Sequence, residues 1–387
     1  MLASSALFLA SFSGGAVAPA ASDRIVNLGD SITDGYTYGQ IIIQALKEAG
    51  KPVPAIICSG SGGNTAAQMA ARVDKTVLVF KPQIVTFSAG TNDALKDVPC
   101  ETYEKALREI AAKIKAEKST MILLTPCEIV RLDGKTPEEK EAFGKKIKTR
   151  LDEFEAVIRK VASENKFIVA ENRALMADAI KSGKNIMVAD GIHPNYLGQT
   201  LIARSILDAM DCKDVQIPKT FEPKLFPGVI REWKMRVAPL DDKKKPLRID
   251  ADTVSRISPD ESWQKYSIPE PAPETAVSPE DWNEQIRRNG FTLKLQEKVG
   301  KGMLQGVADI QSDKERQVYF QIGGAVSTLW LNGVKIHDQG TVWTGFHAGK
   351  ERISATLKAG SNRVAVEITG TNFFLSVTDK MIWEDVL

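Results

Sequence analysis

The sequence predicts a two-domain protein in which a three-layer α/β/α sandwich with a five-stranded parallel sheet is followed by an all-β jelly-roll sandwich. Three observations support this fold class. The chain has 387 residues, which is too long for one typical domain. Short apolar runs alternate with amphipathic segments between residues 24 and 210. From residue 291 onward, the two-residue alternation typical of β-strands dominates instead.

Five apolar runs in the first half predict buried parallel strands, because such strands form continuous runs rich in Val, Ile and Leu. The predicted strands cover residues 25–28, 55–58, 84–87, 121–124 and 167–169. Amphipathic segments predict the helices, at residues 40–49, 66–73, 103–117, 137–165 and 197–210. Strands that alternate with helices build a parallel sheet with helices on both faces, here a flavodoxin-like arrangement.

The second half begins with a change of composition. Residues 213–290 carry many prolines and a Lys-rich run, which predict a linker and loops, although an early strand is expected over residues 229–235. Further strands are predicted at residues 291–295, 317–322, 328–331, 353–357 and 363–368. Asn332-Gly333 predicts a hairpin turn, and short strands with such turns are typical of a β-sandwich. The predicted domains are residues 22–212 and 226–387, joined by a linker at 213–225.

Residues 1–21 predict a signal peptide. They are apolar and rich in small residues, with an apolar stretch at residues 6–12 and a small-residue cleavage site at Ala18-Pro-Ala20. This predicts a secreted or periplasmic protein. No basic segment precedes the apolar stretch, so the alternative is a disordered tail rich in Ala and Ser. No run reaches the ~18 apolar residues that a membrane span needs.

Composition excludes several function classes. The net charge is +2 with 26% charged residues, which gives no basic footprint for nucleic acid. The four cysteines, at positions 58, 100, 127 and 212, form neither a CxxC pair nor a metal-ligand spacing. In a secreted chain they would form one or two disulfides, and in a cytosolic chain they would be buried thiols. Cys58 ends an apolar run, which favours burial.

The chemistry-bearing stretches follow predicted strands. Ser31 lies in a Gly-Asp-Ser turn at the carboxyl end of the first strand, the edge of an α/β sheet where ligands bind. On its own it could be a nucleophile or only a helix N-cap. A serine nucleophile needs a base with an orienting carboxylate. His193 is the one histidine of the first half, and Asp190 precedes it by three residues.

Two Gly-rich loops follow the second and third strands. Gly63 offers a backbone amide close to a ligand, and Asn92 offers an NH₂ group, as an oxyanion hole requires. A Gly-rich loop after a strand can instead hold a phosphate or a dinucleotide. However, the full GxGxxG spacing, the GxxxxGK[ST] loop and the GxSxG elbow are absent.

Four blocks together resemble the SGNH/GDSL hydrolase family, at residues 29–35, 62–65, 90–93 and 190–193. The resemblance covers roughly residues 24–210 and implies that Ser31 is the nucleophile, His193 the base and Asp190 its orienting carboxylate. It also implies an oxyanion hole made of the Ser31 and Gly63 amides with Asn92, and no metal or organic cofactor. Candidate substrate-binding residues in or beside these blocks are Asp30, Asn64 and Tyr36.

The second half resembles galactose-binding-like jelly-roll domains around residues 329–336 and 359–366. This resemblance implies a polysaccharide contact in which Trp330, Trp343 and Phe346 stack on sugar rings. The alternative is that these aromatic residues pack in the core. His337 and His347 are expected to be surface residues.

The sequence therefore predicts a secreted serine esterase that hydrolyses ester bonds, above all O-acetyl groups on a carbohydrate. One alternative is a lipid or thioester acylhydrolase of the lysophospholipase type, although the polar loop at residues 130–136 argues against an apolar substrate. Another alternative is a non-catalytic carbohydrate-binding surface protein, which would require the predicted site to be vestigial.

Overall fold

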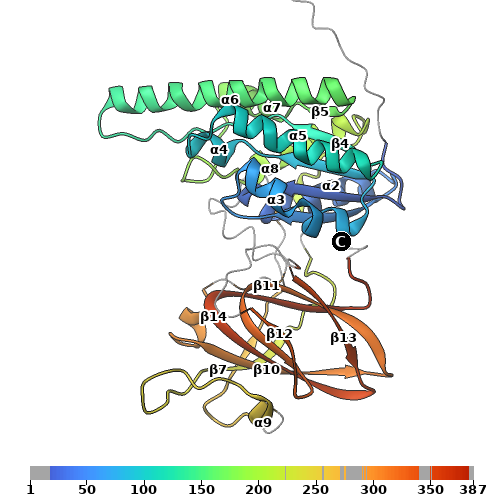
Figure 1. Cartoon of the computed structure of the whole chain (residues 1–387), viewed down its shortest axis with the longest axis vertical. Coiled ribbons are helices and arrows are strands. Elements are labelled where there is room, and N and C mark those ends of the chain that lie inside the picture. Colours follow the sequence, from blue (N-terminus) through green and yellow to red (C-terminus); the bar gives the residue numbers. More distant parts are fainter. Residues whose placement is uncertain are drawn as a thin grey trace, which may run out of the picture.

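The computed structural model describes residues 18–222, 224–254, 257–270, 274–275, 290, 292, 294–339, 349 and 351–382. Most of the predicted signal peptide, and also Trp343, Phe346 and His347, lie outside the described residues. The two halves of the chain form separate sheets, one wrapped by helices and one built of antiparallel strands (Figure 1).

The first half contains a parallel sheet with the strand order β2-β1-β3-β4-β5, which confirms the flavodoxin-like prediction. Its strands are β1 (Arg24–Gly29), β2 (Ala55–Gly60), β3 (Ile84–Ser88), β4 (Thr120–Leu124) and β5 (Ile168–Ala170). Gly29 at the end of β1 pairs with Gly60 and with Ser88, the last residues of β2 and β3. The three strands therefore end together, and the loops that follow them meet at one edge.

Helices cover both faces of this sheet, because successive strand residues point to opposite sides. Ile25 faces a core with α2 and α8, whereas Val26 faces a core with α3, α5 and α6. Thr65 and Thr136 begin α3 and α6 with capping boxes. The helices are α1 (Ser31–Asp34), α2 (Thr37–Glu48), α3 (Ala66–Thr76), α4 (Thr91–Leu95), α5 (Cys100–Ala116), α6 (Pro137–Asn165), α7 (Asn172–Lys181) and α8 (Tyr196–Ala209).

The second half is an antiparallel all-β domain, consistent with the predicted jelly roll. Its sheet has the order β12-β11-β14-β10-β7-β8, and β13 pairs with β11. Asn332 and Gly333 both have positive φ in the two-residue turn between β11 and β12, as predicted. The strands are β7 (Glu232–Val237), β8 (Gln264–Ser267), β10 (Leu304–Ser312), β11 (Arg316–Leu331), β12 (Val334–Asp338), β13 (Glu351–Leu357) and β14 (Gly360–Thr378).

One predicted strand of this domain, residues 291–295, is confirmed only in part: Thr292 forms an antiparallel bridge with Phe373, and residues 291 and 293 lie outside the described residues. Within residues 291–295, which were expected to extend, Leu295 begins a short helix, α11 (Leu295–Val299). Leu295 and Val299 are both buried, because a spacing of four residues places them on the same face of this helix. A second short helix, α9 (Ala251–Val254), lies in the segment between β7 and β8.

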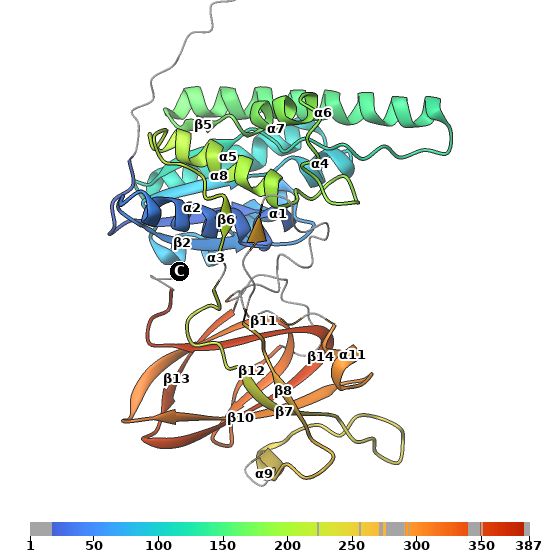
Figure 2. The same cartoon turned by 180° about the vertical axis from the view of Figure 1, so that it is seen from behind.

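The predicted linker, residues 213–225, is packed against the first half. Phe221 is fully buried and its ring stacks on Tyr196 at 6.0 Å. It belongs to β6 (Thr220–Phe221), which pairs with β9 (Glu274–Thr275) beside the α/β domain (Figure 2). The predicted domain boundaries themselves stay predictions.

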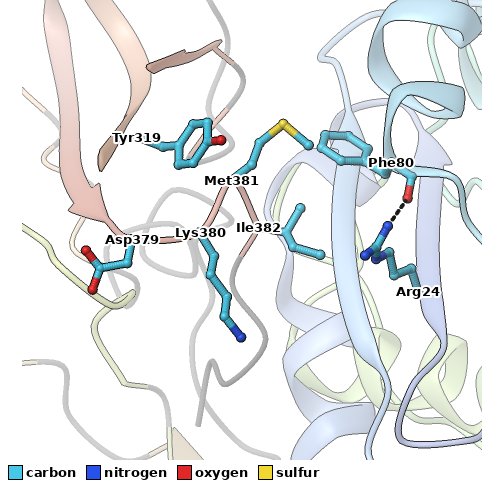
Figure 3. A pocket seen from close by; sticks show the side chains of 7 residues that line it. All are labelled: Arg24, Phe80, Tyr319, Asp379, Lys380, Met381 and Ile382. Atoms are coloured by element: carbon cyan, nitrogen blue, oxygen red, sulfur yellow. Dashed lines mark hydrogen bonds between the residues drawn. The ribbon is translucent and has the colours of Figure 1, made fainter. Parts of the chain in front are cut away.

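Aromatic and cationic side chains join the two halves. The Phe226 ring lies 5.3 Å from Tyr36 and 5.9 Å from Phe374, and the Arg352 guanidinium lies 4.6 Å from the Phe80 ring centre. A pocket of about 320 Å³ lies at the same junction, and Figure 3 shows the side chains that line it. Its lining residues are Arg24, Phe80, Tyr319, Asp379, Lys380, Met381 and Ile382.

The described residues also show the state of the cysteines and whether any described helix could cross a membrane. All four cysteines are free thiols, and Cys58 is buried as predicted. Among the helices described, none is both long enough and apolar enough to cross a membrane. Within the same ranges, no three His, Cys, Asp or Glu side chains gather in a way that could hold a metal ion.

Candidate active site

Ser31 is the first residue of α1, directly after β1. The N-cap of this helix is Asp30, whose Oδ1 accepts a hydrogen bond from the Ile32 amide at 3.0 Å. Ser31 is therefore not the cap, and its own amide has no partner within the helix. Gly29 allows this tight turn, because a Cβ there would collide with the Thr33 side chain.

Ser31, His193 and Asp190 lie in one chain of hydrogen bonds. Ser31 Oγ is 2.8 Å from His193 Nε2, and His193 Nδ1 is 2.6 Å from Asp190 Oδ2. Partial burial by itself would raise the pKa of Asp190. Hydrogen bonds from the His193 ring and from the His193 and Ile192 amides outweigh burial and lower this pKa below its ordinary value. A charged carboxylate therefore orients an imidazole that can take the Ser31 proton.

The segment after β4 supports the loop that carries these two residues. The amides of Val130 and Arg131 donate to the Gly191 carbonyl at 2.9 and 3.0 Å. Gly191 has a φ of +68°, and a Cβ there would lie 2.8 Å from the Arg131 nitrogen. Only glycine fits both conditions, so the sequence Asp190-Gly-Ile-His193 sets the approach of the two segments.

Asn92, the first predicted oxyanion donor, lies in α4. Its Nδ2 donates to Asp30 Oδ2 at 3.2 Å, which orients the amide and leaves its second N–H unused by Asp30. The Gly62 amide donates to Asp34 Oδ2 at 3.1 Å. The Gly63 amide makes no hydrogen bond in the described part of the chain, while the Gly63 carbonyl accepts from Lys96 Nζ at 2.6 Å. Of the two glycines, Gly63 is therefore the one whose backbone amide is available to donate a hydrogen bond to a ligand.

The structure does not bring two of the three predicted substrate-binding residues to a surface. Asp30 is 2% exposed and is occupied by Ile32 and Asn92. Tyr36 is 4% exposed, and its hydroxyl donates to the Ile56 carbonyl. Both side chains are therefore buried and engaged within the protein. The prediction failed because a motif fixes the order of residues but not the direction in which each side chain points. Asn64 remains partly exposed.

Arg72 on α3 was not predicted to take part in the site. Its Nε donates to Asn64 Oδ1 at 2.8 Å, and its Nη2 donates to the Gly29 and Ser59 carbonyls at 2.8 and 2.9 Å. Burial lowers the pKa of Arg72 to about 10. The guanidinium thereby fastens the loop that carries Gly63 to the end of β1. The sequence feature that could have indicated this role is an arginine beside the apolar residues of an amphipathic helix.

Asp93 connects two of the loops and was also missed. Both its carboxylate oxygens accept from the Ala66 amide, at 3.1 and 3.3 Å. Burial raises the pKa of Asp93 to about 6 from 3.8, although the Ala66 and Gly90 amides oppose the rise. The folded protein therefore retains a proton that the unfolded chain loses between about pH 4 and 6. Stability from this group is greatest below that window and is lost as pH rises through it.

Asp93→Asn should remove this pH dependence. From pH 4 to 7, the free energy of unfolding of the wild type should fall by about 3 kcal/mol relative to that of the variant. Urea unfolding of both proteins at several pH values measures the difference. Asp190 is present in both proteins, so its contribution cancels, whereas the difference includes the coupling by which the charge of Asp93 raises the pKa of Asp30. Parallel stability curves would contradict the raised pKa.

Comparisons with known proteins concern the same half of the chain. Residues 28–201 match the GDSL-like lipase/acylhydrolase family. An acetylxylan esterase of Geobacillus stearothermophilus is 23% identical over 212 residues, which cover 48% of this chain and 92% of that protein. The thioesterase 1/protease 1/lysophospholipase L1 of Escherichia coli is 26% identical over 186 residues, which cover 48% and 81%. A crystal structure of the Geobacillus enzyme has 20% identity and a TM-score of 0.44, and covers 51% of this chain and 99% of that chain.

Proposed function

Because the α/β domain is a GDSL-type hydrolase domain that acts on ester bonds, we propose that this protein is a secreted serine esterase that removes O-acetyl groups from a carbohydrate. The observation that carries the proposal is the hydrogen-bonded chain from Ser31 through His193 to Asp190, with distances of 2.8 and 2.6 Å. A serine, a base and an orienting carboxylate are the components that acyl transfer requires.

In the proposed reaction, Ser31 Oγ attacks the ester carbonyl while its proton passes to His193 Nε2. The negative charge that develops on the carbonyl oxygen is held by the Ser31 and Gly63 amides and by Asn92. His193 then gives the proton to the sugar oxygen as its bond to the acyl carbon breaks, so that the sugar leaves with a free hydroxyl and an acetyl-serine forms. His193 next takes a proton from water, whose oxygen attacks the acyl carbon, and returns that proton to Ser31 Oγ as the acyl bond breaks and acetate leaves.

The acetylated carbohydrate is favoured by the similarity to an acetylxylan esterase and by the β-domain that follows. A second candidate is a lipid or thioester acylhydrolase, favoured by the similarity to the Escherichia coli thioesterase. One structural observation also supports it. Val130 and Leu132 are 43% and 54% exposed, so two apolar side chains lie near the Asp190 loop within a segment, residues 130–136, that is otherwise polar.

A substrate panel distinguishes the two candidates. Acetate release from acetylated polysaccharides should exceed release from the same polysaccharides after deacetylation. In a second assay, p-nitrophenyl acetate should be cleaved faster than p-nitrophenyl esters whose acyl chains have eight or more carbons. A preference for long acyl chains would favour the second candidate. If the protein cleaves small esters but releases no acetate from any acetylated polysaccharide, it is an esterase with another natural substrate.

Asn92→Ala should lower kcat by about 10²- to 10³-fold, because one preorganised oxyanion donor is lost in the transition state. KM should change little, since the ground-state carbonyl gains less from this donor. Steady-state kinetics with a small acetyl ester measure both constants. Asn165→Ala, at the end of α6, is the matched control and should retain wild-type rates. A rise in KM at unchanged kcat would assign Asn92 to substrate binding instead.

A further inference from the structure

The second domain contains a pocket of its own, far from Ser31. It has a volume of about 320 Å³, at the small end of the ~300–1,000 Å³ typical of ligand sites. It lies between β7 and the segment that contains α9, at the end of the β-domain remote from the α/β domain (Figure 1). The lining residues are Arg236, Thr253, Ile257, Ser258 and Trp263.

Arg236 is held in place on two sides. Its Cζ lies 4.5 Å from the centre of the Trp263 ring, a cation–π distance. Its Nε donates to Gln305 Oε1 at 3.0 Å, and Gln305 is itself buried and fixed by the Leu247 carbonyl at 2.8 Å. The terminal nitrogens Nη1 and Nη2 have no hydrogen-bond partner among the residues that the structure describes. The guanidinium is therefore preorganised with its outer edge unoccupied.

The charge of Arg236 is not balanced by an ion pair within the described ranges. Burial lowers its pKa, and Asp260 opposes this only through the longer-range attraction of its charge. Asp260 Oδ1 is already engaged by the Ser262 amide and hydroxyl, at 2.9 and 2.6 Å. A planar guanidinium edge without a partner matches the two oxygens of a carboxylate in a bidentate contact.

Trp263 limits what kind of ligand fits. It is only 7% exposed and packs with Ile249, Val254 and Trp330, so its ring offers no open face on which a sugar could stack. The recognition group of the pocket is thus the Arg236 edge. Ser258 adds an exposed hydroxyl to the lining, whereas the Thr253 hydroxyl already donates to Asp250 Oδ1 at 2.7 Å.

We propose that this pocket binds the carboxylate of an acidic sugar, such as a uronic acid residue of a polysaccharide. The choice of a sugar as the carrier of the carboxylate rests on the proposed carbohydrate esterase function. The β-domain would then anchor an acidic glycan while the α/β domain acts on its acetyl groups. Trp330, the aromatic residue first expected to contact sugar, serves as part of the wall behind this pocket.

Isothermal titration calorimetry on the full chain tests the proposal. The ligands are a glucuronic acid-bearing xylo-oligosaccharide and the neutral oligosaccharide of equal length. The wild type should bind the acidic ligand at least about 10-fold more tightly, and Arg236→Gln should weaken that binding about 10- to 100-fold. Arg236→Lys keeps the charge but not the bidentate edge and should give an intermediate loss.

Lys234→Gln is the matched control, because it removes one positive charge from an exposed position of the same strand, β7. An equal loss in this variant would show that the acidic ligand is attracted only by general charge, and would overturn the proposal. Unchanged binding in Arg236→Gln would also overturn it. Hydrolysis of a small acetyl ester should be unaffected in Arg236→Gln. Failure of the esterase function would appear in that assay, independently of the binding result.

Discussion

Ser31→Ala should abolish ester hydrolysis, with kcat for a small acetyl ester falling on the order of 10⁴- to 10⁶-fold. The reason is that Ser31 Oγ is the atom that lies 2.8 Å from His193 Nε2, at the end of the hydrogen-bonded chain. Its loss removes the bond-forming atom, whereas the remaining oxyanion donors sustain only a residual rate above that in water. Steady-state kinetics with p-nitrophenyl acetate measure the loss.

A fluorophosphonate probe separates this expectation from a non-catalytic role. The wild type should become labelled at Ser31, and the alanine variant should not. Ser182→Ala, at an exposed serine after α7, is the control and should keep both its label and its rate. Retained hydrolysis in the Ser31 variant would overturn the proposed mechanism. The absence of both labelling and activity in the wild type would favour a carbohydrate-binding protein with a vestigial site.

The parallel sheet could be predicted because its strands are buried on both faces. Ile84, Val85 and Phe87 are all fully buried, and the polar residue between them, Thr86, is buried with its hydroxyl donating to Asn27 Oδ1. The four-residue α1 and five-residue α4 could not be predicted, because neither is long enough to show a helical period.

The start of the β-domain was harder to predict for the opposite reason. Leu293 and Leu295 alternate as in a strand, but Leu295 and Val299 are also spaced as on one face of a helix. Short apolar segments satisfy both patterns, and tertiary packing decides between them. Here Leu295 and Val299 both pack into the β-domain core, and the helix results.

The site could be predicted to the extent that its residues follow strand ends. Ser31, Gly63 and Asn92 each lie within a few residues of the end of β1, β2 or β3, in a short helix or a loop, so the parallel sheet collects them at one edge. The direction of a side chain within a loop could not be predicted, as Tyr36 shows by pointing into the core. Arg72 joins three segments through hydrogen bonds to Gly29, Ser59 and Asn64. No local sequence pattern encodes contacts of this kind between segments.

Asp190→Asn should lower kcat by about 10⁴-fold with little change in KM. Asp190 Oδ2 now faces His193 Nδ1 at 2.6 Å and holds the proton on that nitrogen, so that Nε2 can accept the Ser31 proton. An asparagine that presents its NH₂ group would favour the opposite tautomer, with the proton on Nε2. Ser31 would then donate to no base, although every distance in the site would be nearly unchanged.

The pH profile distinguishes this tautomer effect from a loss of structure. The lowered pKa of Asp190 keeps this carboxylate charged at acidic pH, so the wild type retains the charged orienting group there. Asp190→Asn should therefore remain slow at every pH while its thermal unfolding stays close to that of the wild type. Asp190 Oδ1 also accepts the Ile192 and His193 amides, and the asparagine carbonyl can keep these bonds. A variant that keeps a kcat close to that of the wild type would contradict the role of Asp190 in orienting His193.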